Sequence, residues 1–68
     1  MTRTEFNTFN MIDGFNSQEL RRVGGRLGYP IEYINDNMIR NAIMDDYSCG
    51  RIGAGEILDA YVIGENQQ

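Results

Sequence analysis

The sequence predicts an all-α fold, a small bundle of three to four short helices around one core. Apolar residues recur at spacings of three and four, and helix-capping residues precede these runs. The alternation of apolar and polar residues that is typical of an amphipathic strand is not visible in the sequence. With 68 residues, the chain is expected to form one domain, residues 1–68, with a small core.

The N-terminal helix is predicted over residues 2–13. Thr2 and Glu5 have the spacing of a capping box, in which the two side chains satisfy each other's backbone N–H groups. Phe6 and Phe9 follow at helical spacing. In so small a chain these two rings either complete the core or form a dimer interface, so the sequence allows a monomer or a homodimer.

The second helix has the clearest start, with Asn16 as N-cap and Glu19 three residues later. It is expected to end at Gly28, because glycine readily takes the left-handed conformation that closes a helix. Gly24 and Gly25 lie inside this helix, and each costs up to about 1 kcal/mol relative to alanine. The helix therefore either frays at these glycines or is closely approached there by another segment.

A third helix is predicted to begin at Pro30, where the missing N–H is tolerated. Its expected apolar stripe consists of Ile31, Ile34, Met38, Ile39, Ala42 and Ile43. Residues 45–55 are rich in glycine and are predicted to be a loop. A last amphipathic helix over residues 55–64 is indicated by Ile57, Leu58, Tyr61 and Val62.

The charge of the chain argues against direct binding of nucleic acid. Ten acidic residues outnumber six basic ones, all arginine, and the net charge is −4. Nucleic-acid binding depends on a basic surface that neutralises phosphates. Four carboxylates instead form a candidate acidic surface near the predicted loop and the last helix: Asp45, Asp46, Glu56 and Asp59.

The residue types present also argue against an enzyme. Histidine and lysine are both absent from the sequence, which excludes histidine general bases, nucleophilic triads and a substitute lysine amine. Cys49 is the single cysteine, so neither an intramolecular disulfide nor a zinc set is expected. We expect no cofactor, no metal, no membrane span and a cytoplasmic location. Met1 is expected to be a true start, so that the chain is a complete small protein.

The segment "RLGYPIEYINDNMIRNAIMDDYSCGRIGAGEILDAYVIGE" resembles a ubiquitin-associated (UBA) domain of the type found in inhibitor-of-apoptosis proteins. The resemblance covers residues 17–65 and implies a three-helix core. Leu27, Gly28 and Tyr29 correspond to the loop between that family's first and second helices. By the same resemblance, the core positions of the second helix are Tyr33, Ile34 and Met38.

The resemblance implies a small protein-interaction module that binds ubiquitin or a similar fold. Its partner-binding residues are Leu27, Gly28, Tyr29, Tyr61 and Val62. The alternative for these positions is that Leu27, Tyr61 and Val62 belong to the core while Tyr29 covers its edge.

A second function also fits a small acidic protein. The chain is then a stand-alone inhibitor or adaptor, encoded by a phage or mobile element, that binds and blocks a protein in the host cytoplasm. If that host protein binds nucleic acid, the acidic surface could occupy the site of its ligand.

Overall fold

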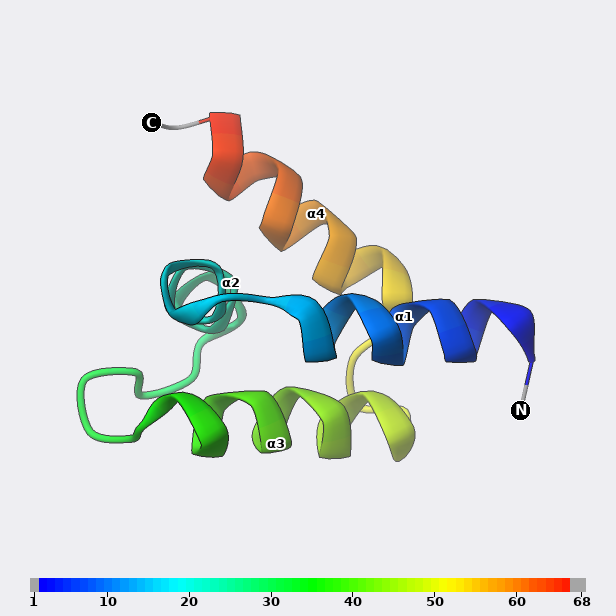
Figure 1. Ribbon diagram of the computed structural model, residues 1–68, viewed down its shortest axis with the longest axis horizontal. Coiled ribbons are helices and arrows are strands. Elements are labelled where there is room, and N and C mark those ends of the chain that lie inside the picture. Colours follow the sequence, from blue (N-terminus) through cyan, green and yellow to red (C-terminus); the bar gives the residue numbers. More distant parts are fainter. Residues whose placement is uncertain (1, 67–68) are drawn as a thin grey trace.

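The computed structural model describes residues 2–66, and side chains are described for residues 2–63. This part of the chain contains four α-helices. They are α1 (Arg3–Gly14), α2 (Ser17–Leu27), α3 (Asp36–Ser48) and α4 (Ala54–Asn66). Within residues 2–66 there is no strand, so the prediction of a small helical bundle is confirmed, with four helices. Figure 1 shows α1 and α3 side by side and antiparallel, with α4 rising obliquely from them. The α2 helix packs most extensively against α4, and next against α3.

All four helices contribute to one core, and α1 also contributes through the residue that follows its end. The buried apolar side chains are Ile12, Phe15, Leu20, Val23, Ile39, Ile43, Ile57 and Ala60. Phe9 packs its ring edge-on against Tyr47 of α3, with 5.2 Å between the ring centres. Phe6, in contrast, remains more than half exposed. The sequence did not decide whether the rings of Phe6 and Phe9 complete the core. In the structure, Phe9 packs within the chain and Phe6 faces solvent.

The predicted starts of the first two helices are confirmed. At α1, Thr2 and Glu5 form a capping box, and at α2, Asn16 and Glu19 do the same. The backbone N–H of Glu19 donates to the Asn16 side chain at 2.8 Å, and the N–H of Asn16 donates to the Glu19 carboxylate at 2.9 Å. The end at Gly28 is also confirmed, since its φ of 93° is left-handed.

The two glycines inside α2 do not interrupt it, because the helix continues to Leu27. Gly24 is buried, and a Cβ atom placed on it would lie 3.0 Å from Cγ2 of Ile39 and 3.1 Å from Cγ2 of Ile31. Of the two possibilities the sequence allowed, the close approach is correct. The missing side chain at Gly24 lets α2 lie directly against these two isoleucines.

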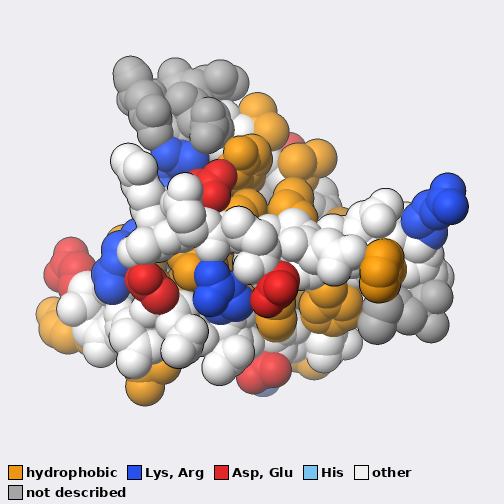
Figure 2. Space-filling model, viewed as in Figure 1, with side chains coloured by type: hydrophobic (Ala, Val, Ile, Leu, Met, Phe, Trp, Pro, Cys, Tyr) orange, Lys and Arg blue, Asp and Glu red, His pale blue; other side chains and the backbone are white. Residues whose placement is uncertain are grey.

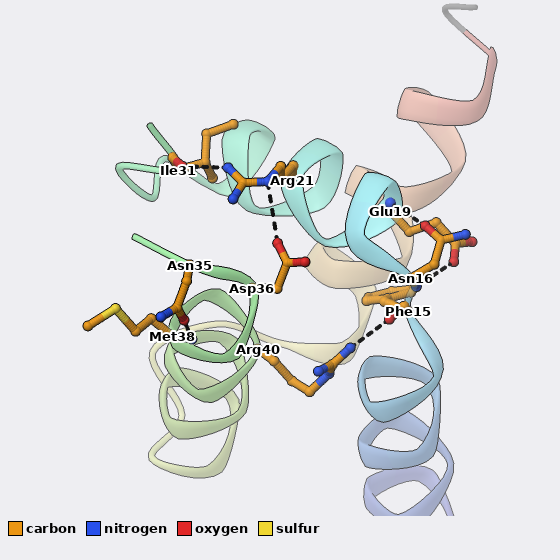
Figure 3. A network of polar contacts seen from close by, with 9 residues as sticks. All are labelled: Phe15, Asn16, Glu19, Arg21, Ile31, Asn35, Asp36, Met38 and Arg40. Carbon is orange, nitrogen blue, oxygen red and sulfur yellow. Dashed lines mark hydrogen bonds and ion pairs between the residues drawn. The ribbon is translucent and has the colours of Figure 1, made fainter. Parts of the chain in front are cut away.

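The predicted start of the third helix at Pro30 is wrong, because α3 begins at Asp36. The side chain of Asn35 accepts the N–H of Met38 at 2.9 Å and acts as the N-cap. Residues 31–34 form a turn, which Arg21 of α2 holds by donating to the carbonyl of Ile31 at 2.8 Å. The same guanidinium pairs with Asp36 at 3.3 Å, as Figure 3 shows. Contacts with α2 thus favour the turn over an earlier helix start.

This late start moves two predicted core positions to the surface. Tyr33 lies in the turn and is 84% exposed, and Met38 in the first turn of α3 is 54% exposed. The buried stripe of α3 is therefore shorter than predicted and consists of Ile39 and Ile43.

The loop predicted over residues 45–55 is also shorter than expected. The α3 helix continues through Ser48, and α4 already begins at Ala54, so both carboxylates Asp45 and Asp46 lie on the last turns of α3. Gly50, with a left-handed φ of 86°, reverses the chain after α3. The connection is thereby reduced to residues 49–53.

Candidate functional site

The α4 helix is apolar on more than one side. Ile57 and Ala60 are buried, and the Tyr61 ring is stacked on Phe15 with 5.5 Å between ring centres. Three further aliphatic side chains on this helix are exposed: Leu58 by 49%, Val62 by 44% and Ile63 by 41%. A helix that is apolar around most of its circumference is usually covered on all sides. In Figure 2, hydrophobic side chains gather along α4 at the molecular surface.

The exposed residues of α4 fall on two different sides of the helix. Successive residues of an α-helix are separated by about 100°, so residues four apart lie about 40° from each other. Leu58 and Val62 therefore share one side, together with Ala54 and Gly55. Ile63 lies about 100° away from Val62. We call the side formed by Ala54, Gly55, Leu58 and Val62 the outer face of α4.

An open groove of about 280 Å³ runs between this face and α1. From α4 it is lined by Ala54, Gly55 and Leu58. From α1 it is lined by Thr4, Asn7, Thr8 and Met11. None of these seven residues is charged, and the hydroxyl of Thr8 already donates to the Thr4 carbonyl at 2.8 Å. The groove thus offers apolar and neutral polar contacts and no ionisable side chain.

The loop predicted to bind a partner, Leu27–Tyr29, is held to the rest of the fold by hydrogen bonds of Tyr29. The backbone N–H of Tyr29 donates to the carbonyl of Gly24 at 2.9 Å. Its hydroxyl donates to the Asp46 carboxylate on α3 at 2.5 Å. Burial, and then this hydrogen bond, raise the pKa of Tyr29 above its ordinary value of 10.0. Leu27 is half-buried against the core, so the side chains of this loop point largely inward.

The five predicted partner-binding residues have different environments. Tyr29 is held by α3, while the ring of Tyr61 is stacked on Phe15. Leu27 is packed against the core, and Gly28 lies exposed at the end of α2. Val62 is the exposed apolar side chain of the set and lies on the outer face of α4.

The candidate acidic surface is partly used by the fold itself. Asp46 pairs with Arg51 at 3.6 Å, besides accepting the Tyr29 hydroxyl. Glu56 accepts the N–H of Gly53 at 3.3 Å at the start of α4. Asp45 and Asp59 are exposed. Within the described residues, no group of three or more acidic or cysteine side chains is placed to hold a metal ion.

Sequence reasoning did not assign Leu58, Gly55 and Met11 to a functional site. A signal for Leu58 was present in the sequence, because Ile57-Leu58 and Val62-Ile63 are pairs of adjacent apolar residues. Adjacent residues of a helix point about 100° apart, so both members of each pair cannot face the same core. Gly55 and Met11 carried no such signal, since the groove depends on how α1 and α4 are placed in space.

No helix in residues 2–66 combines the length and the apolar content needed to cross a membrane. Comparison of the chain with models of protein families, with curated proteins and with solved structures found no match.

Proposed function

We propose that this protein is a non-catalytic protein-interaction module that binds its partner through the outer face of α4. The observation that supports this most is the exposure of Leu58 and Val62 on a helix whose other side is in the core. Contiguous exposed apolar side chains next to a groove are a feature of interaction sites. The neutral lining of the groove supports binding rather than catalysis.

The size of this surface points to a weak and transient complex. Burying a leucine or valine side chain fully is worth about 1.5–3 kcal/mol. Since Leu58 and Val62 are each about half exposed, covering them adds roughly 1 kcal/mol apiece. Association also costs several kcal/mol in lost freedom of motion, so the partner must make further contacts around these two side chains.

Ubiquitin is the partner class that the resemblance to UBA domains implies, with contacts at the Leu27–Tyr29 loop and at the end of α4. The test is a titration of isotope-labelled protein with ubiquitin, followed by NMR. We expect the resonances of Gly28, Tyr29 and Val62 to shift. If no resonance moves at millimolar ubiquitin, ubiquitin is rejected as the partner.

A pair of adjacent substitutions tests the proposed module independently of ubiquitin. Val62→Asp places a charge on the outer face of α4, whereas Ile63→Asp places the same charge about 100° away at a site of similar exposure. In affinity capture from cells that encode the protein, we expect the Val62 variant to lose a partner that the wild type and the Ile63 variant retain. Equal capture by all three forms would exclude the outer face of α4 as the binding site.

A further inference from the structure

We infer that the outer face of α4 binds a basic amphipathic helix of another protein, whose apolar side covers Leu58 and Val62 and whose lysine or arginine pairs with Asp59. This inference rests on the proposed function, because it assigns a chemistry to the partner of the same face. The charge of α4, the position of the Asp59 carboxylate and the open space at Gly55 support it.

All charged residues of α4 are acidic. They are Glu56, Asp59 and Glu65, and no arginine or lysine lies within Ala54–Asn66. Glu56 and Asp59 are both exposed, and they are three residues apart, so they are neighbours on the surface of the helix. The apolar side chains of the outer face are therefore bordered by negative charge, which attracts a basic partner and repels an acidic one.

The arginines of the chain leave this charge largely uncompensated. Five of the six arginines already interact within the chain: Arg21, Arg22, Arg26, Arg40 and Arg51. The sixth, Arg3, lies in the first turn of α1 and not on α4. Within the described part of the chain, the Asp59 carboxylate has no hydrogen bond and no ion pair. This carboxylate is thus available to a cation of another protein.

Gly55 provides room for such a cation beside Asp59. Gly55 is four residues before Asp59 and Val62 is three residues after it, so the three positions are neighbours on one side of α4. A Cβ atom placed on Gly55 has no other described atom within 4 Å. Lysine and arginine pack their long aliphatic stems on apolar surface while their charged ends reach outward. The stem of such a residue fits over Gly55, beside Val62, with its charge at Asp59.

The groove next to the outer face determines which side of the partner is apolar. Its lining is uncharged and includes Met11 of α1 and Leu58 of α4. Asp59 points about 100° away from Leu58 around the helix, so negative charge borders the docking surface on the side away from the groove. A partner with apolar residues toward the groove and basic residues toward Asp59 matches both sides. An amphipathic helix has this pattern, whereas a uniformly basic segment does not.

An NMR titration of the isotope-labelled whole chain with a model peptide tests the inference. The peptide has about 14 residues, enough for a helix, with leucine along one side and lysine along the other. We expect a dissociation constant on the order of 0.1–1 mM and shifts at Gly55, Leu58 and Val62. An analogue with glutamate in place of lysine should bind about tenfold more weakly, or worse. A scrambled peptide of the same composition, which has no apolar side, should do the same.

Asp59→Asn and its matched control Asp45→Asn locate the ion pair. Each removes one negative charge from an exposed helical site, so both lower the net charge alike, and circular dichroism should show an intact fold. Asp59→Asn should weaken binding of the lysine peptide about two- to fivefold, as expected for one exposed ion pair, and high salt should abolish this difference. Asp45→Asn, on α3, should leave the affinity nearly unchanged.

Three results would overturn the basic partner: no shift at millimolar lysine peptide, equal affinity for the lysine and glutamate peptides, or equal weakening by Asp59→Asn and Asp45→Asn. The capture experiment separates this failure from that of the proposed function. Val62→Asp puts an unpaired carboxylate against the apolar side of the partner, so it weakens binding despite its added negative charge. If the peptide fails but Val62→Asp loses a captured protein, the basic partner is refuted and the module is retained. Capture unchanged by Val62→Asp refutes both.

Discussion

The close approach at Gly24 yields a quantitative test of how α2 packs. In Gly24→Ala, the added methyl group would lie 3.0 Å from Ile39 and 3.1 Å from Ile31. Ile39 is fully buried and has little room to move. Forcing an extra carbon into a packed site costs about 1–3 kcal/mol. Alanine gains up to about 1 kcal/mol over glycine from its helix preference, so the net destabilisation should be up to about 2 kcal/mol.

Gly25→Ala is the matched control on the same helix. Gly25 is exposed, and its added methyl group would lie 3.3 Å from Cδ1 of Ile31, the flexible end of that side chain. We therefore expect Gly25→Ala to be neutral or stabilising by up to about 1 kcal/mol. In thermal unfolding, each kcal/mol corresponds to about 4–8 °C for a domain of this size. If Gly24→Ala is as stable as Gly25→Ala, the close packing of α2 on Ile39 is refuted.

Three further predictions concern a cap, the core and a tyrosine. Asn16→Ala removes the acceptor for the N–H of Glu19 and should cost about 1 kcal/mol in urea unfolding, whereas Asn41→Ala on the exposed side of α3 should be nearly neutral. Ile43→Val should cost about 1 kcal/mol through the methyl group lost from a fully buried site, and no loss would contradict its burial. Tyr29→Phe should cost about 1 kcal/mol at neutral pH, because the bond to Asp46 is lost. The pKa of Tyr29 is raised in the folded state, so as the pH rises the unfolded chain loses the hydroxyl proton first. The difference in free energy of unfolding between the wild type and Tyr29→Phe should therefore shrink above about pH 10. A stability difference between these two forms that stays constant with pH would contradict the raised pKa of Tyr29.

The features that sequence reasoning predicted correctly depend on residues close together in the chain. The capping box of Asn16 and Glu19 and the left-handed Gly28 are set within one helical turn, so the start and end of α2 were predictable. The start of α3 was not, because Pro30 and Asn35 both carry helix-start signals. Arg21, from the preceding helix, holds the turn between them, and its contact with Ile31 is not visible in local spacing.

The candidate site was less predictable than the fold for a similar reason. The apolar residues of α4 surround most of the helix, so their pattern does not identify the side that faces the core. The packing of α2 against α4 decides this orientation, and it leaves Leu58 and Val62 outside. For Tyr29, the sequence suggested a position at the edge of the core, but its hydrogen bond to Asp46 joins residues 17 positions apart. Such a pairing requires the fold to be known.

Phe15, between α1 and α2, affects which parts of α1 unfold locally and which unfold only with the whole protein. Its carbonyl accepts a hydrogen bond from the guanidinium of Arg40 at 2.7 Å, as Figure 3 shows. Its buried ring is stacked against the ring of Tyr61. Both partners are distant in the sequence, so these contacts at the end of α1 form only when α3 and α4 are in place. Backbone amides near Ile12 should therefore exchange hydrogen only through global unfolding, whereas those in the exposed first turns of α1 exchange through local opening. We therefore expect the N-terminal helix, 12 residues long, to have a less stable first half and a more stable end.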